Sequence, residues 1–255
     1  MLKLIKCEFL KLKRKPLVFI SVFLSTLLPL AYAIFLADAN TDVDATNNMM
    51  SGLFQLSAYL LLMPLLVILA SNLLFEELDN DTLKNLVTIP VNRTKLVLSK
   101  MMVLLIFAIG FMAVGLSGLT AEVFFHGGTQ IVLAGLTTYM VCMPLILIFG
   151  QIRGAYLGGS ILAFFLGYSM MFFKGGILAS IYPFSAALIL VGFDMSEYAG
   201  TTTAPNPLLA VIGVGIMVLW AVLLLVMSSN KKEMKARKQT KAKGRGKRAV
   251  RRKGG

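Results

Sequence analysis

The chain alternates between long apolar runs and shorter polar intervals. A helix of about 18 or more apolar residues is long enough to cross the roughly 30 Å of hydrocarbon in a bilayer. Such runs recur at about 17–37, 53–75, 101–120, 131–149, 155–173 and 207–227. Residues 122–130 predict a tight connection between the third and fourth runs. The pattern predicts an all-α integral membrane protein with six transmembrane helices.

Residues 76–100 form the one long polar interval inside this apolar body, between the second and third predicted spans. Leu83, Leu86 and Val87 follow helical spacing, and Pro90 would end the helix. At the start of a helix, carboxylates suit the positive end of its dipole. The interval begins with four of them, Glu76, Glu77, Asp79 and Asp81. We predict a short amphipathic helix, which could lie on lipid but which we expect to dock into a soluble partner.

Residues 1–15 form a basic segment that leads into the first span. Its apolar residues broadly follow helical spacing, and its cations take the other side. The apolar positions are Leu2, Leu4, Ile5, Phe9 and Leu12, and the cations are Lys3, Lys6, Lys11, Lys13, Arg14 and Lys15. A basic amphipathic helix of this kind lies in the headgroup layer and contacts anionic lipids. We favour this cytoplasmic interfacial helix over the alternative, a solvated positive tail that only fixes the orientation of the chain.

Residues 177–193 are apolar but short, and Pro183 interrupts them. Lysine and arginine are retained on the cytoplasmic side of a membrane. If 177–193 enters the bilayer and returns on the same side, 24 of the 25 lysines and arginines lie in cytoplasmic segments, and both termini are cytoplasmic. A full crossing would place the basic C-terminal tail outside. We therefore predict a re-entrant segment before the sixth span, buried against protein.

Residues 231–255 hold thirteen lysines and arginines against one acid, Glu233. Because this tail has almost no apolar content, we expect it to be disordered. It divides the chain into a transmembrane domain, residues 1–230, and a polybasic cytoplasmic tail. The tail suits a contact with anionic lipids. No nucleic-acid partner is expected, since the tail lacks aromatic residues that could stack on bases.

The sequence lacks the motifs of an enzyme or of an ion-coupled carrier. No G-x-x-x-x-G-K-[ST] loop is present to hold nucleotide phosphates. Glu76 and Glu77 resemble the paired glutamates of membrane-embedded prenyl-protein proteases, but Asp81 stands where that family has arginine. Charges inside the predicted spans are nearly missing, so there is no proton relay of the kind that pumps use. We expect no catalytic residue, no metal site and no cofactor bound by this chain.

These features together resemble the permease subunit of type-2 ABC exporters. The resemblance rests on the basic segment before the first span, six spans with small outer loops, the polar helix between the second and third spans, and the re-entrant stretch. The motif residues are Glu76, Glu77, the run Thr82-Leu83-Lys84-Asn85-Leu86, Pro90, Arg93 and Lys95. The chain departs from the family at Asp81, where glycine is common. The resemblance covers about residues 1–230, and the absence of a large outer domain makes the chain similar to the small permeases of bacitracin and lantibiotic immunity systems.

The resemblance implies that residues 76–100 contain a cytoplasmic coupling helix. This helix would dock into a separate ABC ATPase subunit, which binds ATP and Mg²⁺. Leu83, Leu86 and Val87 would be the buried anchors of the contact. The rest of the docking set would be Glu76, Glu77, Asp79, Thr82, Lys84 and Arg93.

The same resemblance implies an assembly and a function. A second permease copy or a sister chain would complete a dimer in the bacterial plasma membrane. The dimer would use ATP to export an amphiphilic substrate, such as a peptide antibiotic or a lipid-like molecule, in an immunity or resistance role. The alternatives are a non-transporting membrane assembly or signalling partner, and an ion-coupled secondary carrier.

Overall fold

The computed structural model describes residues 2–13, 16, 18–20, 23, 27, 56–79, 93–116, 121–150, 152, 155–173, 176–192 and 206–227. Within these residues every regular element is a helix. Four of the helical stretches are long and apolar enough to cross a membrane, over Ser57–Leu74, Leu96–Val114, Val132–Phe149 and Pro207–Met227. The prediction of an all-helical membrane protein is confirmed. Most of the first predicted span lies outside the described residues, so the count of six spans stays a prediction.

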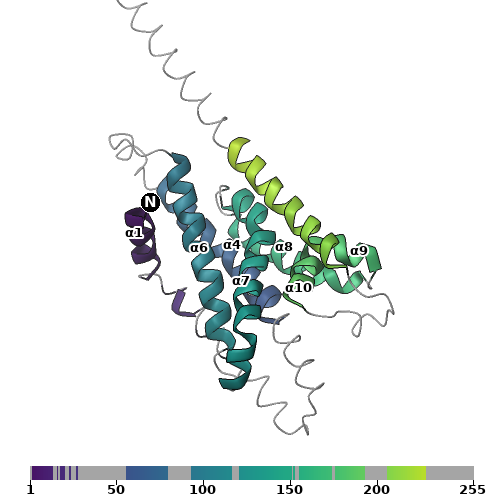
Figure 1. Cartoon of the computed structure of the whole chain (residues 1–255). Helices are drawn as coiled ribbons and strands as arrows, with labels where there is room; N and C mark the ends of the chain where they lie inside the picture. The colour runs from purple at the N-terminus through teal and green to yellow at the C-terminus, as the bar shows by residue number, and fades with distance from the viewer. Residues whose placement is uncertain are drawn as a thin grey trace, which may run out of the picture.

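The helices form one bundle, which Figure 1 shows along the chain from purple to yellow. In chain order they are α1 (Leu2–Lys13), η1 (Leu56–Leu62), α4 (Met63–Asp79), α6 (Arg93–Leu116), α7 (Ala121–Phe149), α8 (Tyr156–Tyr168), η2 (Ser169–Phe172), α9 (Gly176–Ile181) and α10 (Pro183–Val191). The last helix is Pro207–Met227. η1 is a π-helical turn that runs directly into α4, and η2 is a 3₁₀ turn that extends α8. α6 and α7 lie side by side, and α1 packs against α6 (Figure 1).

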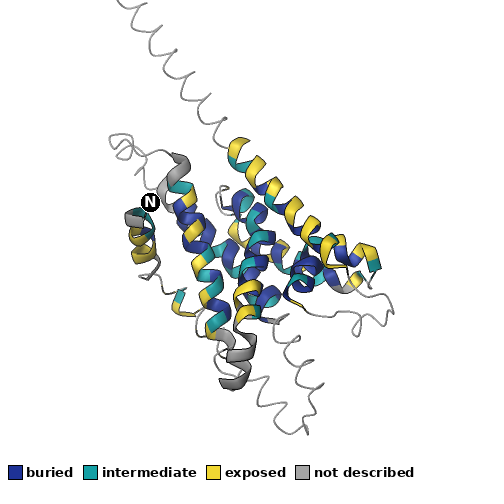
Figure 2. Ribbon diagram, viewed as in Figure 1, coloured by how far each residue is buried: buried dark blue, intermediate teal, exposed yellow. Residues whose placement is uncertain are grey.

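α4 is the centre of the bundle. It packs against α6, α7 and α8. Burial covers 67% of the Ser57–Leu74 stretch but only 28% of the last helix, whose exposed face is apolar (Figure 2). A helix that is apolar on every side suits a central position, because protein surrounds it there. The last helix is equally apolar at the edge of the bundle, as expected for a surface that faces lipid.

Small residues on α8 allow this helix to approach the centre of the bundle closely. Gly159, Ala163 and Gly167 are spaced four residues apart and are all buried. A Cβ atom at Gly159 would lie 2.9 Å from Cγ1 of Val67, and one at Gly167 would lie 3.0 Å from Cβ of Tyr59. Helices in membranes commonly associate through such small-residue stripes. The face of α8 that carries them therefore lies against η1 and α4.

α7 differs from the sequence prediction. The predicted connection over residues 122–130 is part of one continuous helix of 29 residues, Ala121–Phe149. Gly127 and Gly128 weaken a helix by about 1 kcal/mol each relative to alanine, but they do not end it. At 1.5 Å per residue, α7 is about 43 Å long, which is more than the roughly 30 Å of hydrocarbon. Its first turns therefore extend beyond the apolar stretch, which begins at Val132.

The predicted re-entrant stretch folds as two short helices, α9 and α10, which meet at Tyr182. Tyr182 has an extended backbone, and Pro183 begins α10, where the missing amide hydrogen of proline costs nothing. α10 ends at Gly192 in the left-handed conformation, with φ of 94°. The nine residues of α10 measure about 14 Å, so this helix alone does not cross the hydrocarbon. α10 is buried against α7, and its re-entrant path stays a prediction.

The last helix packs against α9. The backbone N–H of Asn206 donates a hydrogen bond of 3.0 Å to Oγ of Ser180. Gly213 lies so close to the carbonyl oxygen of Ile181 that a Cβ atom would not fit between them. The buried face of the last helix repeats at helical spacing, through Ala210, Val214, Met217 and Ala221.

Candidate functional site

The structure places the two ends of the predicted docking segment. Glu76, Glu77 and Asp79 belong to the last turn of α4, and Arg93 is the first residue of α6. α4 and α6 pack against each other, so the segment that joins them begins and ends on one pair of helices. The other predicted docking residues, Thr82, Leu83, Lys84, Leu86 and Val87, lie outside the described residues. The docking role of the whole set stays a prediction.

A buried charged pair lies next to these two helix ends. Glu8 on α1 is 3% exposed, and Lys100 on α6 is 1% exposed. The Nζ atom of Lys100 lies 3.6 Å from Oε2 of Glu8 and donates a hydrogen bond to the backbone carbonyl of Leu73 in α4. Lys100 is part of α6, and its ammonium group contacts α1 and α4. It thus joins three helices that are far apart in sequence.

Lys11 connects this pair to the surface of α1. Its Nζ atom donates to Oε1 of Glu8 at 2.8 Å, and its side chain is 47% exposed. Among the described residues, Oε2 of Glu8 makes no hydrogen bond, and its nearby charge is the ammonium of Lys100. Burying a charge is costly unless the charge is paired and hydrogen-bonded. Glu8 and Lys100 meet that condition in part through each other and through their contacts with Lys11 and Leu73.

The orientation of α1 explains why its one acid is buried. Ile5 and Glu8 are one helical turn apart, and both face the bundle, where Ile5 packs against the core. Lys6, Phe9 and Leu10 are exposed. The inner side of the helix is occupied by Glu8, and Phe9, one of the predicted apolar positions, is exposed, so a lipid contact of Phe9 stays a prediction. The exposed Phe9 and Leu10 leave apolar surface on the outer side of α1, next to exposed lysines.

The predicted membrane-surface lysines fall into three groups. Lys6 and Lys11 are exposed on α1. Lys3 and Lys13 also lie in α1, and for them the structure describes the helical backbone. Arg14 and Lys15 lie outside the described residues. A lipid contact of this segment stays a prediction, and it is compatible with the exposed lysines and apolar residues of α1.

The charged pair lies close to the segment between α4 and α6. Leu73 precedes Glu76 by three residues and Lys100 follows Arg93 by seven, which corresponds to about 5 Å and about 10 Å along the two helices. Figure 1 places α1 beside the start of α6, and the last helix ends toward the same end of the bundle. The charged pair therefore lies within about two helical turns of both ends of this segment.

Sequence reasoning missed both members of the pair. Lys100 counts as the last residue of a polar interval by composition, yet it lies inside the apolar stretch Leu96–Val114. Glu8 is the one acid among six cations in residues 1–15, and it stands one turn after Ile5. A single acid in a basic segment is the sequence feature that could have indicated a buried ion pair with a lysine.

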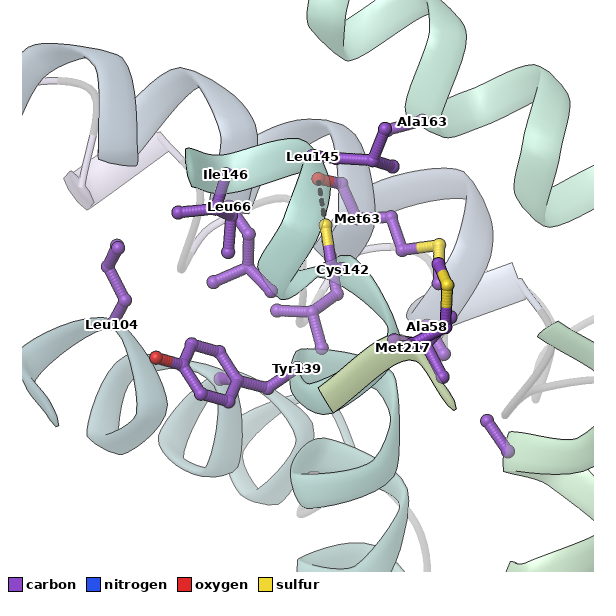
Figure 3. Close-up of a cluster of buried hydrophobic side chains, with 14 of the residues drawn as sticks. Ala58, Met63, Leu66, Leu104, Tyr139, Cys142, Leu145, Ile146, Ala163 and Met217 are labelled. Carbon is purple, nitrogen blue, oxygen red and sulfur yellow. Dashed lines mark hydrogen bonds between the residues drawn. The ribbon is translucent and has the colours of Figure 1, made fainter. Parts of the chain in front are cut away.

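Deeper in the bundle, polar side chains join helices through backbone carbonyls. The hydroxyl of Tyr139 in α7 donates to the carbonyl of Met101 in α6 at 2.7 Å. The hydroxyl of Tyr59 in η1 donates to the carbonyl of Phe184 in α10. Figure 3 shows the thiol of Cys142, which donates to the carbonyl of Met63 over 3.8 Å amid buried apolar side chains. A polar group inside a membrane needs a hydrogen-bond partner within the protein. These contacts provide such partners and join neighbouring helices.

Within the part of the chain that the structure describes, no group of three or more His, Cys, Asp or Glu side chains could hold a metal ion. Cys142 is buried and Cys7 is exposed on α1, far from each other along the chain. The buried hydroxyl groups of Tyr59 and Tyr139 and the thiol of Cys142 contact other helices, as described above.

Comparison with protein families identifies the family of this chain. The family model described as "ABC-2 family transporter protein" matches residues 4–170, about two thirds of the chain. The match covers most of α1 and all of α4, α6, α7 and α8, and thus includes the charged pair and the segment between α4 and α6. No curated protein and no solved structure matches the chain.

Proposed function

This chain belongs to the ABC-2 family of transporter proteins, and from that premise we propose that it couples a separate ATPase subunit to the export of an amphiphilic substrate. Family membership makes the chain a permease component of an ABC transporter, not the ATPase itself. The observation that carries the proposal is the family match over residues 4–170, on a chain with four helices able to cross a membrane. ATP and Mg²⁺ belong to the partner subunit.

The ATPase would dock on the segment between α4 and α6. Three features support this location. The segment contains acids at its start and the apolar positions Leu83, Leu86 and Val87. Its flanking helices pack against each other and, through Lys100, against α1. A short helix with a few apolar anchors and a polar rim has the composition of a protein–protein contact.

The proposed orientation places this segment and both termini in the cytoplasm of a bacterial cell. Lysines and arginines concentrate in residues 1–15, 76–100 and 231–255, and such residues are retained on the cytoplasmic side. The start of α6 and the end of the last helix lie toward one end of the bundle, which is compatible with this orientation (Figure 1).

The interior of the bundle favours an amphiphilic substrate over a small ion. Among the described residues, the buried charged side chains are Glu8 and Lys100, and the other buried polar groups belong to serines, threonines, two tyrosines and Cys142. A path lined by apolar and small polar residues suits a peptide antibiotic or a lipid-like molecule, and export of such a substrate would serve immunity or resistance. Two copies, or this chain and a sister chain, would enclose the path, with apolar faces such as that of the last helix available for the contact.

Co-purification tests the proposal. The full-length chain, expressed with candidate ABC ATPase subunits of its source organism, should bring down one of them in detergent. Changing Leu83 and Leu86 together to Asp should abolish the capture, because both anchors would become charged, while the matched variant Asn85→Asp, which adds one charge between them, should retain it. The proposal is wrong if the double variant, inserted normally, still binds the ATPase and supports its activity.

Proteoliposomes separate the alternatives. The chain alone should not move an amphiphilic probe, such as a fluorescent lantibiotic, in response to an ion gradient, and the complex should move it when ATP is added. Gradient-driven movement by the chain alone would indicate a secondary carrier. ATPase capture without any ATP-dependent movement would favour a non-transporting assembly or signalling partner.

A further inference from the structure

We propose that Glu8 and Lys100 are positioning residues that fix α1 to the ends of α4 and α6, so that α1 moves together with the segment between those two helices. The transmission part of this inference rests on the proposed function, and the attachment of α1 does not. The pair would then connect the ATPase-driven motion of the segment to the interfacial helix of the permease.

The first argument is the number of helices that meet at one ammonium group. Lys100 is part of α6, its carboxylate partner Glu8 is part of α1, and its carbonyl partner Leu73 is part of α4. The hydrogen bond to Leu73 is directional, and the ion pair with Glu8 acts at one point of α1, whereas apolar packing is spread over the helix surface. α1 is thus held in register with both helices, not only against their surface.

The second argument is burial. Glu8 and Lys100 are 3% and 1% exposed, and they are the buried charged side chains among the residues whose burial the structure describes. Separating α1 from α6 would pull the carboxylate of Glu8 away from the buried ammonium of Lys100, and breaking a buried ion pair is strongly unfavourable. The paired state is therefore favoured over any state in which α1 drifts away alone.

The third argument is position along the helices. Leu73 and Lys100 lie within about one and two helical turns of Glu76 and Arg93, where the predicted docking segment begins and ends. A rigid-body shift of these helix ends is a common form of switching. Through Glu8, such a shift would carry α1 with it.

The pair could instead serve stability alone, and one double variant separates the two roles. Glu8→Gln removes the carboxylate that faces the buried ammonium of Lys100, and Lys100→Met removes the ammonium that faces Oε2 of Glu8, so each single variant should lower the thermal stability. The double variant E8Q/K100M removes both charges and with them the cost of burying one charge without the other. Its stability should return to that of the wild type, but α1 should lose its directional attachment.

A distance measurement reports the attachment directly and needs no ATPase. Spin labels would be placed on the native Cys7, which is exposed on α1, and on Leu98→Cys, at an exposed position of α6, with the buried Cys142 changed to Ala. The wild-type background should give one narrow distance distribution in liposomes. E8Q, K100M and E8Q/K100M should each broaden it. Lys100→Arg, which keeps the charge, should preserve most of the narrow component.

The matched control is Ser99→Ala. Ser99 is buried next to Lys100 on α6, but its hydroxyl donates within its own helix, to the carbonyl of Leu96 at 2.7 Å. Removing it leaves the contacts between helices in place. Both the distance distribution and the ATPase activity should therefore match those of the wild type.

The ATPase activity of the purified complex in phosphatidylethanolamine–phosphatidylglycerol liposomes tests transmission. Coupling between two sites commonly corresponds to about 5- to 150-fold, and we expect E8Q/K100M to lower permease-dependent ATP hydrolysis about 10-fold with the ATPase still bound. A narrow distance distribution in E8Q/K100M would overturn the inference, as would activity that recovers together with stability. If the wild-type chain captures no ATPase, the proposed function fails, and the distance distributions still decide whether the pair holds α1.

Discussion

The hydroxyl of Tyr139 in α7 lies 2.7 Å from the backbone carbonyl oxygen of Met101, the residue that follows Lys100 in α6. At these two neighbouring residues α6 is therefore held by three other helices. The side chain of Lys100 contacts α1 and α4, and the carbonyl of Met101 accepts the hydrogen bond from α7. This part of α6 is tied to its neighbours by directional contacts as well as by packing.

Tyr139→Phe should lower the free energy of unfolding by about 1 kcal/mol, the usual net worth of one hydrogen bond. The ring stays in place, so only the contact with Met101 is lost. Tyr156→Phe on α8 is the control, because Tyr156 is 43% exposed and should tolerate the change. Equilibrium unfolding in mixed micelles measures both variants, and equal stability of the two would show that the Tyr139 contact contributes nothing.

Gly159→Ala should destabilise the bundle, and Gly158→Ala should not. The added methyl group at Gly159 would lie 2.5 Å from Cγ of Phe149 and 2.9 Å from Cγ1 of Val67, whereas the space around Gly158 is open within 4 Å. Overpacking of this kind costs about 1–3 kcal/mol. Thermal unfolding in detergent compares the neighbouring substitutions, and a G158A variant as unstable as G159A would refute the close approach of α8 to α4.

The contact between the last helix and α9 gives a second pair of matched glycines. At Gly213 an added methyl group would meet the carbonyl oxygen of Ile181, which is backbone and cannot rotate away, whereas Gly215 has nothing within 4 Å. Gly213→Ala should separate the helices and lower the melting temperature. Gly215→Ala should be neutral or slightly stabilising, since alanine favours helix by about 1 kcal/mol over glycine. A G213A protein with unchanged stability would argue against this packing.

The two cysteines should differ sharply in reactivity. Cys7 is exposed on α1, and Cys142 is buried with its thiol toward the carbonyl of Met63. A maleimide dye should therefore label one thiol of the native protein in detergent and both after denaturation. Cys7→Ser should remove the fast labelling, and Cys142→Ser should leave it unchanged. Rapid labelling of the native C7S variant would contradict the burial of Cys142.

The long apolar helices could be predicted from the sequence because length and hydropathy alone decide whether a helix can cross a bilayer. The stretches found at 57–74, 96–114, 132–149 and 207–227 all overlap predicted spans. Their ends were harder to predict. The predicted connection over 122–130 is helical because it contains no proline and its two glycines are too few to end a helix.

The buried charged pair could not be predicted from local pattern. Hydropathy treats Lys100 as a residue in contact with water, whereas the contacts with Glu8 from α1 and with the Leu73 carbonyl from α4 favour its burial. Likewise, the local pattern of residues 1–15 does not say which side of α1 faces the bundle, and Glu8 is the residue buried there. Both outcomes depend on contacts between helices that are distant in sequence.

The central claim is that the chain receives its energy from an ATPase bound to the segment between α4 and α6, and that segment must then face the cytoplasm. Its sidedness can be measured with Asn85→Cys in a Cys7→Ser background, labelled on intact cells with a membrane-impermeant maleimide. Thr41→Cys, in the polar interval after the first predicted span, is the control for an outer position. We predict that Thr41→Cys is labelled on intact cells and that Asn85→Cys is labelled only after permeabilisation. Labelling of Asn85→Cys on intact, sealed cells would contradict the account.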